Sequence, residues 1–235
     1  MSHEASVHVA ADSELRPVGD LGRILFLIVG MTIWADVNDY LVTHYHLSKL
    51  ATFVMRTVVD CGGVVWLGCL RWGKSSLRDL GWRFAHPLRL VLVGLALTTM
   101  HVGTVFAAVA LFEGGTVVRE FAGNVVALSV GQHLFYGFLG VKIAFWEETL
   151  FRGDLLRALE RRMRVAPVLL ASGVIFALYH LHLDDLAEGY RVFLSPGFLV
   201  KGFIGAIYAF TVIRTRSLLP VAIAHALSWA IFANN

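Results

Sequence analysis

Long uncharged stretches alternate with short charged connections along most of this chain. Residues 90–112 and 165–183, for example, contain no Asp, Glu, Lys or Arg. A helix of about 20 apolar residues crosses the hydrocarbon core of a bilayer, so stretches of this length are typical of membrane spans. The pattern predicts seven transmembrane helices, over residues 21–42, 50–70, 90–112, 121–160, 165–183, 198–213 and 217–232.

The connections between these spans differ in charge. Basic connections follow the second, fourth and sixth spans, whereas acidic or weakly charged ones follow the third and fifth. Because basic residues favour the cytoplasmic side of a membrane, we expect a cytoplasmic N-terminus. In the first basic connection, Leu77, Leu80 and Trp82 are interleaved with the charges, which predicts a short interfacial helix near residues 73–88.

Composition agrees with a membrane protein. The chain is 57% hydrophobic and only 16% charged, whereas an ordinary soluble domain is about 25% charged. No basic stripe with interleaved aromatic residues is present, which excludes the usual pattern of a nucleic-acid-binding protein. We therefore expect an all-α polytopic helix bundle, divided into a polar N-terminal segment (1–20), N-terminal transmembrane helices (21–120) and a motif-bearing region (121–235).

Charged residues at the end of the fourth span are the first candidates for chemistry. Glu147 and Glu148 are adjacent there, and Arg152 follows four residues after Glu148. On a helix Glu148 and Arg152 share a face and can pair. Glu147 points about 100° away from Glu148, so it stays free for another role. The alternative is an ion pair at a helix end with no chemical function. In the second span, Arg56 and Asp60 have the same spacing, and we expect them to pair as well.

Two histidines lie at the depth of Glu147. The basic turn around Met163 joins two antiparallel helices, with Glu147 16 residues before it and His180 17 residues after it. At 1.5 Å per residue, both lie about 25 Å from the turn. His225 lies nine residues along the last span, which starts from the same side after Arg216. We expect the carboxylate and two imidazoles to meet inside the bilayer, where ionisable groups need partners. His101 and His133 also lie in predicted spans, so a single histidine in a span is weak evidence of a functional site.

The same residues resemble the motifs of a known family. Glu147 to Arg152 matches EExxxR, Phe176 to His180 matches FxxxH, and His225 resembles the histidine of a third motif. These are motifs of the CPBP family of intramembrane proteases, which includes CAAX prenyl endopeptidases of the Rce1 type, Abi proteins and bacteriocin-processing relatives. The similar region starts near residue 125 and extends to the C-terminus.

The resemblance implies roles for these residues. Glu147 would be the general base for a water held between itself and His180, and His225 would stabilise the tetrahedral oxyanion. Glu148 and Arg152 would brace the helix. Phe176 would wall the cavity or hold the His180 ring.

One position departs from the family pattern. The third motif usually continues as HxxxN, but Trp229 occupies the Asn position here, with Ser228 before it. Loss of one oxyanion donor commonly costs about a hundredfold to a thousandfold in rate. Either Ser228 substitutes, or the enzyme is slow, or the chain is an inactive relative.

Three hypotheses therefore stay open. The first is an intramembrane endopeptidase without a cofactor, which hydrolyses a membrane-associated protein or peptide in a bacterial inner membrane. The second is a zinc protease that uses Glu147, His180 and His225 as ligands, which the lack of an evident carboxylate behind either histidine disfavours. The third is a membrane scaffold or immunity-like protein on the same fold. The sequence leaves the substrate, its prenylation and the oligomeric state undetermined.

Overall fold

The computed structural model describes residues 21–181 and 184–232, and the expected polar segment 1–20 lies outside the described residues. The described part of the chain is helical and contains no β-strand, as expected for an all-α bundle. The α-helices are α1 Leu21–Tyr45, α2 Lys49–Thr57, α3 Pro87–Phe112, α4 Gly115–Ala127, α5 Val130–Glu148, α6 Leu156–Glu160, α7 Val165–Tyr179, α8 Pro196–Thr215 and α9 Leu219–Phe232. Two π-helical segments, η1 Val58–Trp72 and η2 Thr149–Leu155, and a 3₁₀ segment, η3 Asp184–Leu194, complete the helices.

These helices occupy the predicted positions of the spans. Within the described residues, four helices are long and apolar enough to cross a membrane, and the bent pair of α4 with the helix after it raises the number to as many as five. The remaining two apolar helices, α7 and α9, are shorter. The structure is therefore that of an integral membrane helix bundle, and seven crossings remain a prediction because two of the helices are short for a full span.

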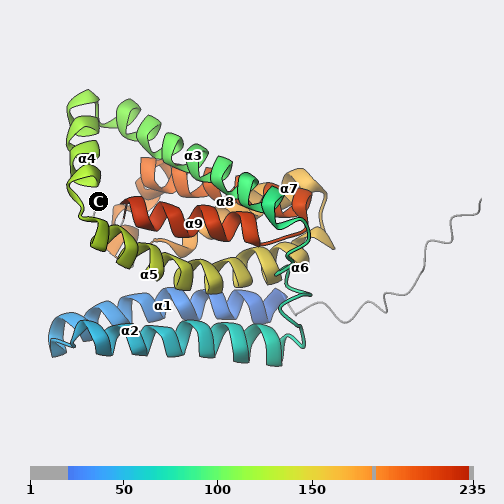
Figure 1. Cartoon of the computed structure of the whole chain (residues 1–235). Helices are drawn as coiled ribbons and strands as arrows, with labels where there is room; N and C mark the ends of the chain where they lie inside the picture. Colours follow the sequence, from blue (N-terminus) through green and yellow to red (C-terminus); the bar gives the residue numbers. More distant parts are fainter. Residues whose placement is uncertain (1–20, 182–183, 233–235) are drawn as a thin grey trace, which may run out of the picture.

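Three helix pairs form the centre of the bundle: α5 with α9, α3 with α9, and α7 with α8. In Figure 1, α9 lies between α3 and α5, and the pair formed by α1 and the α2–η1 helix lies on the other side of α5. This arrangement brings the last turns of α5 and α7 to the middle of α9, although these segments are far apart in sequence.

The fourth predicted span is broken. Its expected start at residue 121 is wrong, because α4 begins at Gly115 and ends at Ala127, and the chain bends by 96° before the next helix. Ser129 causes the restart: its side chain accepts a hydrogen bond from the backbone of Gln132, whose side chain in turn reaches back to the backbone of Ser129. This reciprocal capping box satisfies N–H groups at the start of α5 and makes Ser129 a better helix start than a helix interior.

The expected interfacial helix near residues 73–88 is also wrong, because residues 73–86 form turns. Burial of individual side chains and backbone groups explains the difference. Leu80 is almost fully buried, and the Trp82 indole Nε1 donates to Thr149 Oγ1 at 2.9 Å. Gly81 has a positive φ of 103°, and its carbonyl accepts from Leu218 N at 2.9 Å. We call residues 76–83 the strap, because they cross η2 and tie it to the start of α9.

Buried ion pairs join helices of the two halves of the chain. Arg23 of α1 contacts Asp154 of η2 at 2.6 Å, with both side chains buried, and a second nitrogen of Arg23 donates to the carbonyl oxygen of Gly68 in η1 at 2.8 Å. These contacts fix the first two helices against the segment that follows Glu148.

The expected pair of Arg56 with Asp60 is wrong. Arg56 pairs with Asp39 of α1 at 2.9 Å, and Asp60 pairs with Lys142 of α5 at 2.7 Å. Asp60 is buried towards α5, so each side chain finds a partner on another helix. Helical spacing alone could not anticipate these competing partners.

Glycine allows α7 and α8 to approach closely. A Cβ at Gly173 would collide with the carbonyl oxygen of Gly202, whereas a Cβ at Gly202 would have no neighbour nearer than 3.8 Å. The contact positions Phe176 and His180, one and two turns further along α7.

We predict opposite effects of alanine at these two glycines. Gly173→Ala should lower the free energy of unfolding by about 1–3 kcal/mol, because overpacking forces the helices apart. Gly202→Ala, the matched control, should be neutral or stabilise the protein by about 0.4–1 kcal/mol, because alanine restricts the unfolded chain. Thermal unfolding of both variants in detergent measures the difference. Equal stability of the two variants would contradict the close approach.

Candidate functional site

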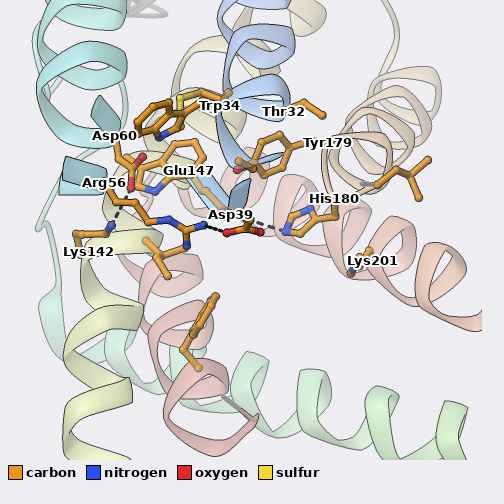
Figure 2. Close-up of a pocket in the computed structure, with 16 residues that line it drawn as sticks. Thr32, Trp34, Asp39, Arg56, Asp60, Lys142, Glu147, Tyr179, His180 and Lys201 are labelled. Atoms are coloured by element: carbon orange, nitrogen blue, oxygen red, sulfur yellow. Dashed lines mark hydrogen bonds and ion pairs between the residues drawn. The ribbon is translucent and has the colours of Figure 1, made fainter. Parts of the chain in front are cut away.

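The two adjacent acids lie at the last turn of α5, immediately before η2. Glu147 is 5% exposed and Glu148 is fully buried. Their side chains leave the helix in different directions: Glu147 borders a cavity, shown in Figure 2, whereas Glu148 faces Arg152 and His225. The π-helical turns of η2 begin at the next residue, and such turns are frequent at functional sites.

His180 ends α7 and faces Glu147. The helix stops at Tyr179, four residues earlier than expected, and His180 is its C-cap. The ring Nδ1 lies 2.8 Å from the carbonyl oxygen of Phe176. A carbonyl oxygen only accepts, so Nδ1 carries the proton and Nε2 is directed elsewhere. Nε2 lies 4.0 Å from Glu147 Oε2, across the interaction drawn in Figure 2.

His225 of α9 approaches the same oxygen from another helix. Its Nδ1 lies 2.8 Å from Glu148 Oε1, so the imidazole donates to the carboxylate. Its Nε2 lies 3.7 Å from Glu147 Oε2. The three side chains that the sequence places at one depth therefore converge, from α5, α7 and α9.

The separations between Glu147 and the two histidines are large enough for one small molecule, such as a water, to bind between them. Distances of 3.7 and 4.0 Å are too long for direct hydrogen bonds, but one water can bridge groups at this separation. Glu147 Oε2 is buried and has no hydrogen-bond partner among the described residues. A buried carboxylate oxygen without a donor is costly, so this site has a physical need for a bound water or substrate group.

Arg152 stabilises Glu148 through a buried ion pair. It is fully buried, and its Nε lies 3.4 Å from Glu148 Oε2, as the spacing predicts. Its guanidinium also stacks 4.0 Å from the centre of the Phe176 ring. Phe176 also contacts His180, with ring centroids 4.5 Å apart. Phe176 thus links Arg152 to the His180 ring.

Ser228 and Trp229, which follow His225 in the third motif, make different contacts. The Ser228 hydroxyl donates to the carbonyl oxygen of His225 at 2.7 Å, so its proton is already used and Ser228 is a poor replacement for the missing amide. Trp229 borders the cavity beside Glu147 and also a second cavity of about 290 Å³ beside His225. Ser228 also lines the second cavity, but of these two residues Trp229 is the one that borders the cavity beside Glu147.

The first cavity has a volume of about 350 Å³ and contains polar groups that sequence reasoning did not include in the site. The pairs Asp39–Arg56 and Asp60–Lys142 form part of its wall, as Figure 2 shows, and Lys201 and Tyr179 complete the polar rim near His180. An unexpected charge inside a predicted span was the available signal for Asp60, Lys142 and Lys201.

His101 is a further residue near the site that the sequence motifs did not indicate. Its Nδ1 lies 2.9 Å from the Tyr208 hydroxyl, and it borders the second cavity with His180 and His225. His133 instead contacts the carbonyl oxygen of Ala230 at 2.7 Å.

The fit of a zinc ion gives a mixed result. The reason for disfavouring zinc was wrong, because Glu148 lies directly behind His225, as carboxylates do behind zinc-bound histidines. However, tetrahedral ligands at 2.0–2.1 Å from zinc lie roughly 3.4 Å apart, closer than the oxygen–nitrogen distances of 3.7 and 4.0 Å here. Within residues 21–181 and 184–232, no group of three His, Cys, Asp or Glu side chains has the arrangement of a metal site.

Comparison with known proteins gives one family match. A family model described as "Type II CAAX prenyl endopeptidase Rce1-like" matches residues 129–231. That region contains Glu147, His180 and His225 together with Arg152 and Phe176. No curated protein and no solved structure gave a significant match. Over residues 129–231 the chain is therefore similar to the Rce1-like family of CAAX-type membrane proteases, in agreement with the resemblance of its three motifs.

Proposed function

We propose that this protein is an intramembrane endopeptidase in which a water activated by Glu147 hydrolyses a peptide bond. The observation that carries the proposal is the position of Glu147 Oε2, a buried oxygen 3.7 and 4.0 Å from the Nε2 atoms of two histidines. Buried ionisable groups at membrane depth are expensive and usually functional.

The water would bind between Glu147 and His180. Because His180 Nδ1 donates to Phe176, the neutral ring presents an Nε2 lone pair that accepts a hydrogen bond from the water. Glu147 accepts the second hydrogen bond. Both hydrogen bonds leave an oxygen lone pair of the water directed away from the acceptors, towards a substrate carbonyl carbon.

Hydrolysis then follows a balanced sequence. The water oxygen forms a bond to the carbonyl carbon while its proton moves to Glu147, which acts as the general base. The resulting oxyanion accepts a hydrogen bond from Nε2 of protonated His225. Glu148, which holds His225 Nδ1 at 2.8 Å, is the counter-ion of that imidazolium. The proton on Glu147 moves to the leaving nitrogen, the C–N bond breaks, and a carboxylic acid and an amine result.

The substrate class follows from the family and the location of the site. The proposed substrate is a membrane-associated protein or peptide, of which a CAAX-type protein is one case. The site lies among apolar helices, so the scissile bond must reach membrane depth. Comparison of the termini of membrane proteins from cells with wild-type protein and cells with Glu147→Gln would identify the substrate.

A catalytically impaired scaffold is the second candidate. Trp229 at the usual Asn position favours it, since Ser228 is engaged elsewhere. If the wild-type protein cleaves nothing and Trp229→Asn creates cleavage, the scaffold proposal replaces the protease proposal.

The first prediction from this mechanism concerns Glu147 as the general base. Glu147→Gln should reduce cleavage by about 10²–10⁴-fold, because a positioned general base contributes that much. Its thermal unfolding midpoint should not fall, because the change removes a buried charge. Glu113→Gln, which makes the same chemical change at an exposed position at the end of α3, is the matched control and should keep full activity. Full cleavage by Glu147→Gln would refute the assignment.

The second prediction separates support from chemistry. Glu148→Gln leaves the fully buried Arg152 without its charged partner, which typically costs about 3–5 kcal/mol. The variant should lose both stability and activity. Arg152→Gln added to it should restore part of the stability but not the activity, because His225 still lacks its counter-ion. Unfolding and cleavage measured on both variants test this, and a double variant no more stable than the single one would argue against the pair.

The third prediction concerns metal dependence. The proposed water mechanism requires no metal, so purified protein treated with a strong chelator should keep its activity. Metal analysis of the same sample should find less than one equivalent of zinc. Loss of activity on chelation, with recovery on adding zinc, would favour the metalloprotease alternative.

A further inference from the structure

A cavity of about 480 Å³ lies at the end of the bundle where α6, the end of α8 and the strap meet. Its wall is rich in guanidinium groups. Arg152 and Arg157 line its inner part, being buried and half-buried, whereas the other arginines are exposed at the mouth. The arginines of the wall are Arg83, Arg152, Arg157, Arg161 and Arg216.

The acids in the wall do not balance these cations. Asp79 and Glu160 are the acidic residues among the described lining residues, so five cations and two anions leave a net charge of +3. Both acids are engaged: Asp79 accepts from the Ser76 hydroxyl at 2.6 Å, and Glu160 pairs with Arg216 at 2.9 Å.

The surplus charge is concentrated around Arg157. Arg83 and Arg161 both repel the Arg157 guanidinium, whereas Asp79 and Asp154 attract it. Guanidinium groups that line one cavity repel one another, and an anion bound between them reduces this cost.

Arg152 adds an independent observation. Its side chain is fully buried, and Nη1 has no hydrogen-bond partner among the described residues. Nη2 donates a long hydrogen bond, of 3.5 Å, to the carbonyl oxygen of Gly205. A buried charged donor without an acceptor carries a large desolvation penalty. Because this residue lines the cavity, the missing acceptor has a place to bind.

The cavity wall is held in place before any ligand binds. The strap is tied to the start of α9 by Leu218 N, which donates to the carbonyl oxygen of Gly81 at 2.9 Å. The Ser217 hydroxyl donates to the carbonyl oxygen of Arg83 at 2.7 Å. These bonds fix the backbone of one wall, so binding would order few additional groups.

We propose that this arginine cavity binds a phosphate group. A phosphate offers several oxygens and a charge of −1 to −2, which matches planar guanidinium groups that approach from several directions. A monoanionic carboxylate would neutralise less of the surplus and satisfy fewer donors. The phosphate can belong to the headgroup of an anionic lipid or to a free phosphate compound, and the two sources share the same recognition chemistry.

The site has a direct connection to the catalytic candidates. Arg152 lines the cavity and also pairs with Glu148, which holds His225. Phosphate binding would therefore stabilise the segment that positions these side chains. The binding itself does not depend on the proposed protease function, so either proposal can fail alone.

The test uses the full-length purified protein and two probes. Inorganic phosphate is titrated in detergent against chloride at equal ionic strength. Separately, the protein is reconstituted in phosphatidylcholine vesicles with and without phosphatidic acid. Thermal unfolding is the readout, because a ligand that binds the folded state raises the midpoint.

The variants separate this cavity from general charge. Arg157→Gln with Arg161→Gln removes two cavity cations and avoids every residue placed in the catalytic site. Arg164→Gln is the matched control, because it removes an exposed cation from the same turn but outside the cavity. If the double variant does not fold, Arg83→Gln at the exposed mouth takes its place.

The expected result is a higher midpoint with phosphate or with phosphatidic acid, in the wild type and in Arg164→Gln. Affinity in the cavity variant should fall by about tenfold or more, the usual loss for a charge-assisted hydrogen bond. A shift with inorganic phosphate identifies free phosphate as sufficient, and a shift with phosphatidic acid alone identifies the lipid headgroup. No shift with either probe, or equal shifts in the cavity variant and the wild type, would overturn the proposal. An equal loss in Arg164→Gln would overturn it as well.

Discussion

The buried carboxylate of Glu148 is the interaction on which the rest of the site depends. It accepts a hydrogen bond from His225 at 2.8 Å and lies 3.4 Å from the Arg152 guanidinium. A carboxylate with no solvent exposure needs such partners, because burying an unpaired charge is prohibitively costly. By engaging both, Glu148 fixes the His225 ring and leaves Glu147 as the acid that faces the cavity.

This arrangement requires several helices to approach closely at one level. The α5–α9 contact brings His225 to the acids, and it depends on Gly140, where a Cβ would lie 2.6 Å from the Cβ of Trp229. The α7–α8 contact at Gly173 positions His180. Interhelical contacts in membranes commonly rely on small residues of this kind, because apolar burial drives helix association only weakly in lipid.

Electrostatic contacts between helices compensate for that weak driving force. Arg23–Asp154 and Asp60–Lys142 each join helices that are distant in sequence. Both pairs surround the end of α5, where the acids lie. In a medium of low dielectric constant, a paired charge of this kind also specifies which helices are neighbours, since a wrong pairing would leave a charge alone.

The sequence by itself determined the fold class, the approximate positions of the helices and the residues that meet at the site. The length of the uncharged stretches indicates the membrane spans. Glu147 and His180 are nearly equally far from the Met163 turn in sequence, and because the rise per residue of a helix is constant, they lie at one level. Motif spacing also indicated the pairing of Glu148 with Arg152. These features depend on local geometry, which the order of residues specifies.

Only the tertiary structure decided the partners that come from other helices. The strap replaced an expected interfacial helix because Leu80 and Trp82 find buried positions against η2. Arg56 pairs with Asp39 of α1 and Asp60 pairs with Lys142 of α5. Glu148 contacts His225 as well as Arg152. The arginine cavity joins residues from three separate parts of the chain. Such contacts depend on which helix faces lie together, and helical spacing within one segment carries no information about a neighbour that arrives from elsewhere in the sequence.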